Sequence, residues 1–225
     1  MSAHFCDAEL ERLSACLSRL LPSLRREDVA ITGGVAIQVG MADLGRQGAR
    51  DVVADLDLVM SSLEAVVPSV AESFLVSHYH VVQPGVPKFM VQLVHPVTRI
   101  RIDMFPDLVG SLARARAVQI GAQAVRMLEL EDIFEHKLLI LAKASSANPV
   151  DPKHADDARA LGELLQRRVP VVARHSLVED VYGIDADARC RRCELSSDPR
   201  FPLAPKEQIF SLLGWTCQTE PAAPR

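Results

Sequence analysis

The stretch VVADLDLVM, residues 52–60, places two aspartates in the middle of an otherwise apolar strand. Successive side chains of a strand point to opposite faces, so Asp55 and Asp57 share one face while Leu56 and Leu58 share the other. The two carboxylates then lie about 6–7 Å apart and repel each other unless a positive charge lies between them. The stretch indicates either a cation site or two solvated charges at a strand edge.

A third carboxylate follows in a similar context, because residues 98–106 also read as a strand. Its apolar side chains alternate with polar ones, which places Asp103 and Arg101 on the same polar face. If this strand lies beside residues 52–60, three carboxylates meet, and oxygen ligands of this kind are typical of Mg²⁺ sites. The alternatives are that Asp103 pairs with Arg99 or Arg101, and that Arg101 is a solvated arginine rather than a phosphate ligand.

The third feature is a double glycine. Residues 28–34 (DVAITGG) read as a short strand that ends at Gly33 and Gly34, and residues 35–44 can continue as a helix. Glycine lets the backbone approach a ligand closely, and a helix N-terminus offers free N–H groups to an anion. Phosphates here and metals at the aspartates would hold a nucleoside triphosphate, and two metals would promote in-line displacement. The other reading of the glycines is a plain turn.

The remaining periodicities predict alternating elements. Leucines at helical spacing predict an amphipathic helix over residues 7–24, and the order of elements indicates a mixed α/β sheet, flanked by helices and followed by a helical C-terminal lobe. We expect a catalytic domain at 1–127, a helical lobe at 128–170 that completes the cleft, and an irregular extension at 171–225. The other predicted elements are helices over 61–75, 128–144, 153–168 and 206–215, and a hairpin of strands over 88–96 and 98–106.

Amino-acid composition indicates the class of protein and the compartment in which it works. The chain has 225 residues, 48% hydrophobic and 24% charged, with a formal charge of −4, which argues against a generally basic surface that coats nucleic acid. No run approaches 18 apolar residues, so no membrane association is expected. Five scattered cysteines fit a reducing compartment, and we expect a cytoplasmic protein. Cys190 and Cys193 form a Cys-x-x-Cys pair, which is either half of a zinc site or a reduced pair without a ligand.

Taken in order, ITGGVA, ADLDLVM and RIDMF resemble the three signatures of the polymerase-beta-type nucleotidyltransferase superfamily. The segment from LELEDIFEHKLL to KHADDARAL is similar to that of the AbiEii-like abortive-infection toxins. There Lys137 falls on the family's lysine and Asp157 on its later aspartate. The resemblance covers roughly residues 28–165. It departs from the family where Arg50 lies one place early, Val53 replaces a hydroxyl residue and His154 replaces an aspartate.

The resemblance implies an enzyme that transfers a nucleoside monophosphate from an NTP, such as ATP, to an acceptor hydroxyl and releases pyrophosphate. It implies Mg²⁺ or Mn²⁺, a tRNA or protein acceptor, and an antitoxin partner. The implied metal ligands and catalytic residues are Asp55, Asp57 and Asp103, with Lys137 as a further catalytic residue and Gly33, Gly34, Arg101 and Asp157 as nucleotide-binding residues. Two alternatives stay open: a small-molecule (antibiotic) nucleotidyltransferase, and a non-catalytic nucleotide-binding module of a toxin–antitoxin pair.

Overall fold

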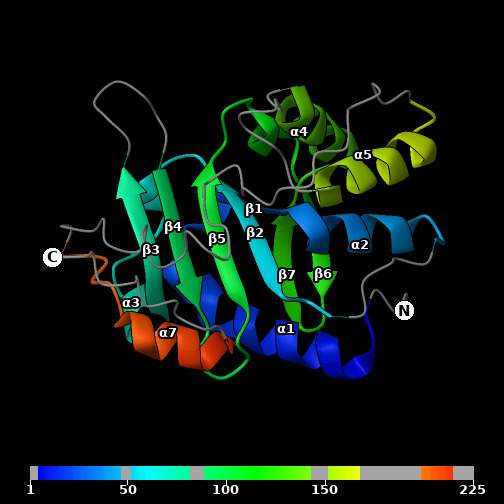
Figure 1. Cartoon of the computed structure of the whole chain (residues 1–225). Helices are drawn as coiled ribbons and strands as arrows, with labels where there is room; N and C mark the ends of the chain where they lie inside the picture. Colours follow the sequence, from blue (N-terminus) through cyan, green and yellow to red (C-terminus); the bar gives the residue numbers. More distant parts are fainter. Residues whose placement is uncertain (1–4, 47–51, 82–88, 143–151, 168–198, 215–225) are drawn as a thin grey trace, which may run out of the picture.

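A computed structural model describes residues 5–46, 52–81, 89–142, 152–167 and 199–214, which form a seven-stranded mixed sheet flanked by helices (Figure 1). The strand order is β3-β4-β5-β2-β1-β7-β6. The pairs β2–β5 and β1–β7 are parallel and the other neighbours are antiparallel. The predicted fold class is confirmed. The strands are β1 (Val29–Thr32), β2 (Asp55–Met60), β3 (Leu75–Val81), β4 (Phe89–Val94), β5 (Arg101–Pro106), β6 (Arg116–Ile120) and β7 (Gln123–Met127).

The helices lie on both sides of this sheet. In Figure 1, α1 and α7 lie along the lower part of the view, whereas α4 and α5 lie above the strands next to α2. Among the described helices, none is long and apolar enough to cross a membrane. Their bounds are α1 (Asp7–Leu20), α2 (Gly33–Asp43), α3 (Val70–Ser73), α4 (Leu130–Ala142), α5 (Pro152–Leu164) and α7 (Lys206–Leu213).

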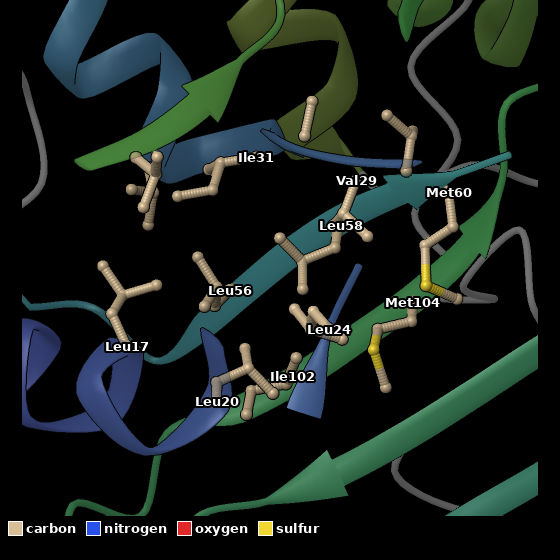
Figure 2. Packing of buried hydrophobic residues seen from close by; sticks show 14 of the residues in the cluster. Leu17, Leu20, Leu24, Val29, Ile31, Leu56, Leu58, Met60, Ile102 and Met104 are labelled. Carbon is tan, nitrogen blue, oxygen red and sulfur yellow. The ribbon is translucent and has the colours of Figure 1, made fainter. Parts of the chain in front are cut away.

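The apolar face of β2 forms the centre of the core. Leu56 and Leu58 are buried on the side of the sheet that α1 covers, where Leu17 of that helix and Ile102 of β5 meet them (Figure 2). Because side chains alternate along a strand, the same packing turns Asp55 and Asp57 to the opposite face. The core therefore decides which face of the sheet carries the carboxylates.

Three sequence expectations need correction or addition. The helix predicted over 61–75 is wrong: the chain forms only a 3₁₀ turn at Leu63–Ala65 and the single helical turn α3. Pro68 cannot donate a helical hydrogen bond and disfavours helical geometry at the residue before it. The strand β3 and the β6–β7 hairpin were not assigned from the sequence. The hairpin closes with a two-residue loop whose first residue, Gly121, has a φ of 56°, as a type II′ turn requires.

The predicted helical lobe is represented by α4 and α5, which pack against each other, and α4 also contacts α2. The described part of the 171–225 extension returns to the sheet. Its Ala204 N–H donates to the Val76 carbonyl oxygen at 2.9 Å, and Ile209 and Phe210 of α7 pack on Val94. The Cys-x-x-Cys pair at residues 190–193 lies outside the described residues.

Candidate functional site

Parallel pairing of β2 and β5 brings the predicted carboxylates side by side. Asp57 is the direct register partner of Asp103, and Asp55 is the partner of Arg101. Neighbouring strands lie about 4.8 Å apart, so the four side chains form a compact cluster on the face away from α1. The predicted adjacency of these two strands is thus confirmed.

Gly33 lies directly against this cluster, at the first position of α2. A Cβ built on Gly33 would lie 2.7 Å from the carboxyl carbon of Asp57, and the residue has a φ of +64°. Only glycine fits both conditions, because an L side chain would overlap the carboxylate and rarely adopts this backbone conformation. Gly34 follows in the same first turn and is buried. The start of α2, with its free N–H groups, is therefore held beside Asp57.

Arg101 lies between two of the carboxylates. Its Nη2 is 3.3 Å from Asp55 Oδ2 and 3.0 Å from Asp103 Oδ2, and the side chain is only 13% exposed. The sequence alternative in which Asp103 pairs with Arg101 is thus present in the structure. It does not exclude the cluster, because the same guanidinium joins carboxylates from both strands.

A buried polar chain, which the sequence reasoning missed, orients Asp103 from the other side. Gln92 Nε2 donates to Asp103 Oδ1 at 2.8 Å, and Ser77 Oγ donates to Gln92 Oε1 at 2.9 Å. All three residues are buried. The available signal was Gln92 itself, the single polar residue in the apolar run FMVQLV of β4, every residue of which is buried. Buried polar side chains are normally kept because each one satisfies another.

Asp57 is a carboxylate with a strongly perturbed titration. Burial, followed by the negative charges of Asp55 and Asp103, raises the pKa of Asp57 from 3.8 to about 7. The positive charges of Lys137 and Arg101 act in the opposite direction and do not cancel this effect. The site thus has a deficit of positive charge at Asp57, and perturbed carboxylates of this kind cluster at functional sites.

Lys137 reaches the site from the helical lobe. Its side chain on α4 is 9% exposed, and its Nζ lies 2.9 Å from Asp157 Oδ2 and 3.0 Å from His154 Nδ1, both on α5. Lys137 is therefore buried, although a lysine on an amphipathic helix is usually exposed. Asp157 and His154, which replaces an aspartate of the family, both contact this ammonium group.

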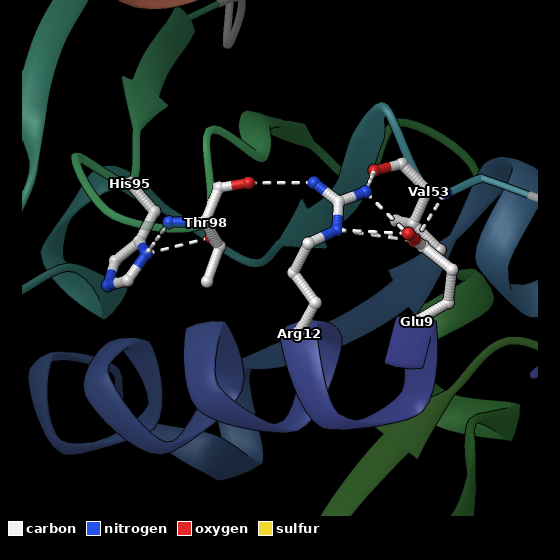
Figure 3. Close-up of polar contacts among 5 residues, drawn as sticks. All are labelled: Glu9, Arg12, Val53, His95 and Thr98. Atoms are coloured by element: carbon white, nitrogen blue, oxygen red, sulfur yellow. Dashed lines mark hydrogen bonds and ion pairs between the residues drawn. The ribbon is translucent and has the colours of Figure 1, made fainter. Parts of the chain in front are cut away.

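A second polar network holds the segments that lead into β2 and β5 (Figure 3). Arg12 of α1 donates to the carbonyl oxygens of Val53 and Thr98, and Glu9 accepts the Val53 N–H at 2.9 Å. His95 Nδ1 accepts the Thr98 N–H at 3.0 Å. Val53 precedes Asp55 by two residues and Thr98 precedes Arg101 by three. One helix therefore fixes the approach of both site strands.

The side chains present fit a divalent cation in their chemistry. Asp55, Asp57 and Asp103 supply hard carboxylate oxygens, which Mg²⁺ prefers, and the missing side chain of Gly33 leaves the space that the Asp57 carboxylate fills. Within the described ranges, however, no group of three or more His, Cys, Asp or Glu side chains is already converged as a metal site. The donors are suitable, but in this arrangement a guanidinium joins two of them.

Comparisons with known proteins give structural likenesses only. No family model and no curated protein sequence matches the chain. A solved structure of the antibiotic-resistance factor ANT(2'')-Ia is 16% identical, with a TM-score of 0.45 over 73% of this chain and 86% of that one. An antigenic nucleotidyltransferase-like protein from Paracoccidioides brasiliensis is 19% identical, with a TM-score of 0.37 over 71% and 78%. JHP933 from Helicobacter pylori is 11% identical, with a TM-score of 0.43 over 71% and 68%.

Proposed function

We propose that this protein is a metal-dependent nucleotidyltransferase, which transfers a nucleoside monophosphate from an NTP to an acceptor hydroxyl. The observation that carries the proposal is the register of β2 and β5, which pairs Asp57 with Asp103 while Asp57 packs against Gly33 at the start of α2. Carboxylates for a cation and a helix N-terminus for an anion then lie at one place. A cation-bound triphosphate needs both.

Each residue has a role in this proposal. Asp55, Asp57 and Asp103 would hold Mg²⁺ or Mn²⁺, which supplies positive charge to the triphosphate and to the attacking and leaving oxygens. Asp103, oriented by Gln92, accepts the proton of the acceptor hydroxyl at a carboxylate oxygen. The backbone N–H groups at Gly33 and Gly34 bind phosphate oxygens.

Lys137 supplies a further positive charge to the proposed site. Lys137 is held by Asp157 and His154, and its positive charge lowers the pKa of Asp57. A preorganised ammonium group stabilises negative charge that develops on a leaving pyrophosphate, because it needs no rearrangement during the reaction. Asp157 acts on the nucleotide through this lysine.

The test is transfer from labelled NTPs. Purified wild-type protein is incubated with each radiolabelled NTP, Mg²⁺ and, in separate reactions, tRNA, cell protein and small hydroxyl compounds. We expect label on one acceptor class, loss of transfer in Asp103→Asn, and full transfer in Asp156→Asn, whose carboxylate lies exposed on α5 and pairs with Arg159. Equal transfer by wild type and Asp103→Asn would contradict the proposal.

The biological role is proposed on the motif resemblance: a cytoplasmic toxin or defence component that acts on tRNA or protein and is controlled by an antitoxin. Its test is expression in a host cell. Growth arrest by the wild type but not by Asp57→Asn supports it. Aminoglycoside or lincosamide resistance without growth arrest identifies the small-molecule alternative instead. If NTP binds but no acceptor is labelled, the chain is a binding module.

A further inference from the structure

Arg101 is placed where a cation shared by two carboxylates would be. A single nitrogen of its guanidinium, Nη2, contacts Asp103 Oδ2 at 3.0 Å and Asp55 Oδ2 at 3.3 Å. The two carboxylates belong to different strands, and the arginine side chain is 13% exposed. An exposed surface pair contributes little and is easily rearranged, whereas this one is enclosed by the site.

A divalent ion and this guanidinium compete for the same two carboxylate oxygens. Mg²⁺ binds carboxylate oxygens at about 2.0–2.1 Å and demands near-octahedral geometry. An ion that binds Asp55 and Asp103 would lie within a few ångströms of Nη2, where two positive charges repel each other strongly in a site of low dielectric. Arginine cannot relieve the repulsion by losing its proton. The repulsion therefore favours one cation at a time on these two oxygens.

We infer that Arg101 holds the place of the divalent cation in the metal-free protein, and that it leaves Asp55 and Asp103 when the cation binds. This inference rests on the proposed function. The exchange explains why the carboxylates are not already converged as a metal site in the described part of the chain. It also assigns Arg101 two successive partners: the carboxylates without metal, and phosphate oxygens, which a guanidinium binds well, once metal and nucleotide are present.

The two roles that Arg101 could have predict opposite effects on metal affinity. If the arginine only positions the carboxylates and remains in place, its removal loosens the site and weakens metal binding. If it competes with the metal, its removal tightens metal binding, although the metal-free protein loses stability because its carboxylates now repel each other. A rise in affinity together with a fall in stability therefore shows that Arg101 opposes the metal, and displacement of its side chain is measured separately.

The experiment uses full-length protein stripped with EDTA and dialysed. Binding of Mn²⁺ is measured by electron paramagnetic resonance of the free ion, and melting temperature is measured without metal and with saturating Mn²⁺. The variants are Arg101→Gln, Arg101→Lys and, as a control with the same change in net charge, Arg116→Gln. Arg116 lies on β6 and pairs with Asp43 at the end of α2. We expect Arg101→Gln to bind Mn²⁺ roughly tenfold more tightly than wild type. The melting temperature of Arg101→Gln without metal should be lower than that of wild type, and Mn²⁺ should raise it by more. Arg116→Gln should match wild type in both measurements.

A second measurement follows the Arg101 side chain directly in the wild-type protein, where its charge is kept. In wild type with nitrogen-labelled arginine, the side-chain Nε–H signal that is absent from Arg101→Lys should shift on Mg²⁺ addition. Unchanged or weaker Mn²⁺ binding by Arg101→Gln, or an Arg101 signal that does not move at saturating Mg²⁺, would overturn this inference alone. Absence of Mn²⁺ binding in wild type and in every variant would overturn the proposed function as well.

Discussion

Replacement of Asp57 with asparagine tests the electrostatics of the site most directly, because asparagine keeps the shape of the carboxyl group that packs against Gly33 and removes its charge. The pKa of Asp57 is raised from 3.8 to about 7 in the folded protein. In the unfolded chain the carboxyl group ionises near 3.8, so between about pH 4 and pH 7 the unfolded state loses its proton while the folded state retains it. The wild type therefore loses stability as the pH rises through this window.

The size of the effect follows from the same two pKa values. Each pKa unit corresponds to about 1.4 kcal/mol, so the difference between 3.8 and about 7 sets an upper limit of about 4 kcal/mol on the stability lost by the metal-free wild type above pH 7. Asp57→Asn carries no such penalty. We expect the two proteins to have nearly equal stability at pH 4, and the variant to be more stable at pH 8 by up to about 4 kcal/mol.

The assay is urea unfolding in EDTA at pH 4, 6 and 8, repeated with Mg²⁺, for wild type, Asp57→Asn and the exposed control Asp156→Asn. Added Mg²⁺ should stabilise the wild type by linkage and the variant much less. Nucleotidyl transfer should be lost in Asp57→Asn. If Asp57→Asn is less stable than wild type at pH 8 without metal, or if the difference between the two does not change with pH, the account of a charge deficit at Asp57 is wrong.

Two further substitutions test the packing around the carboxylates. Gly33→Ala should destabilise the protein by more than about 2 kcal/mol and abolish transfer, because the added Cβ overlaps Asp57. The control Gly45→Ala, at a φ of +70° with no neighbour within 4 Å, adds backbone strain but no overlap. Urea unfolding of both variants separates the cost of the overlap from the cost of the strain. Gln92→Leu removes the donor to Asp103, so it should lower the free energy of unfolding by about 1–3 kcal/mol and reduce transfer. The control Gln119→Leu, on the exposed edge of β6, should change neither stability nor transfer. Equal stability and equal transfer for the two leucine variants would contradict the role of Gln92.

Patterns of period two and short signatures made the centre of this structure predictable. The alternation around Asp55 and Asp57 predicted both the strand and the face of the carboxylates, since a one-residue slip of register would have moved Leu56 and Leu58 out of the core to the carboxylate face. Asp103 could be placed beside them because its strand has the same alternation. The fold class followed from the order of these elements.

The parts that sequence reasoning missed depend on partners distant in the chain. Residues 61–75 carry helical spacing, but Pro68 and the packing of Phe74 and Val76 into the core favour an irregular crossing into β3. The role of Gln92 depends on the neighbouring strand and on Ser77, 15 residues away. Arg101 was placed on the correct face, but its contact with two carboxylates depends on the register of β2 and β5, which no single segment encodes.

The energetics of the cluster favour a functional over a structural reason for its residues. An ionic cluster that served only to join β2 and β5 would need no carboxylate at position 57, because the guanidinium of Arg101 already joins Asp55 to Asp103. Asp57 instead introduces a penalty of up to about 4 kcal/mol at neutral pH, against a total stability of about 5–15 kcal/mol for a typical domain. An apolar residue or asparagine at this place would make the metal-free protein more stable. A carboxylate that opposes folding, packed against a glycine that leaves it room, is what the proposed cation site requires.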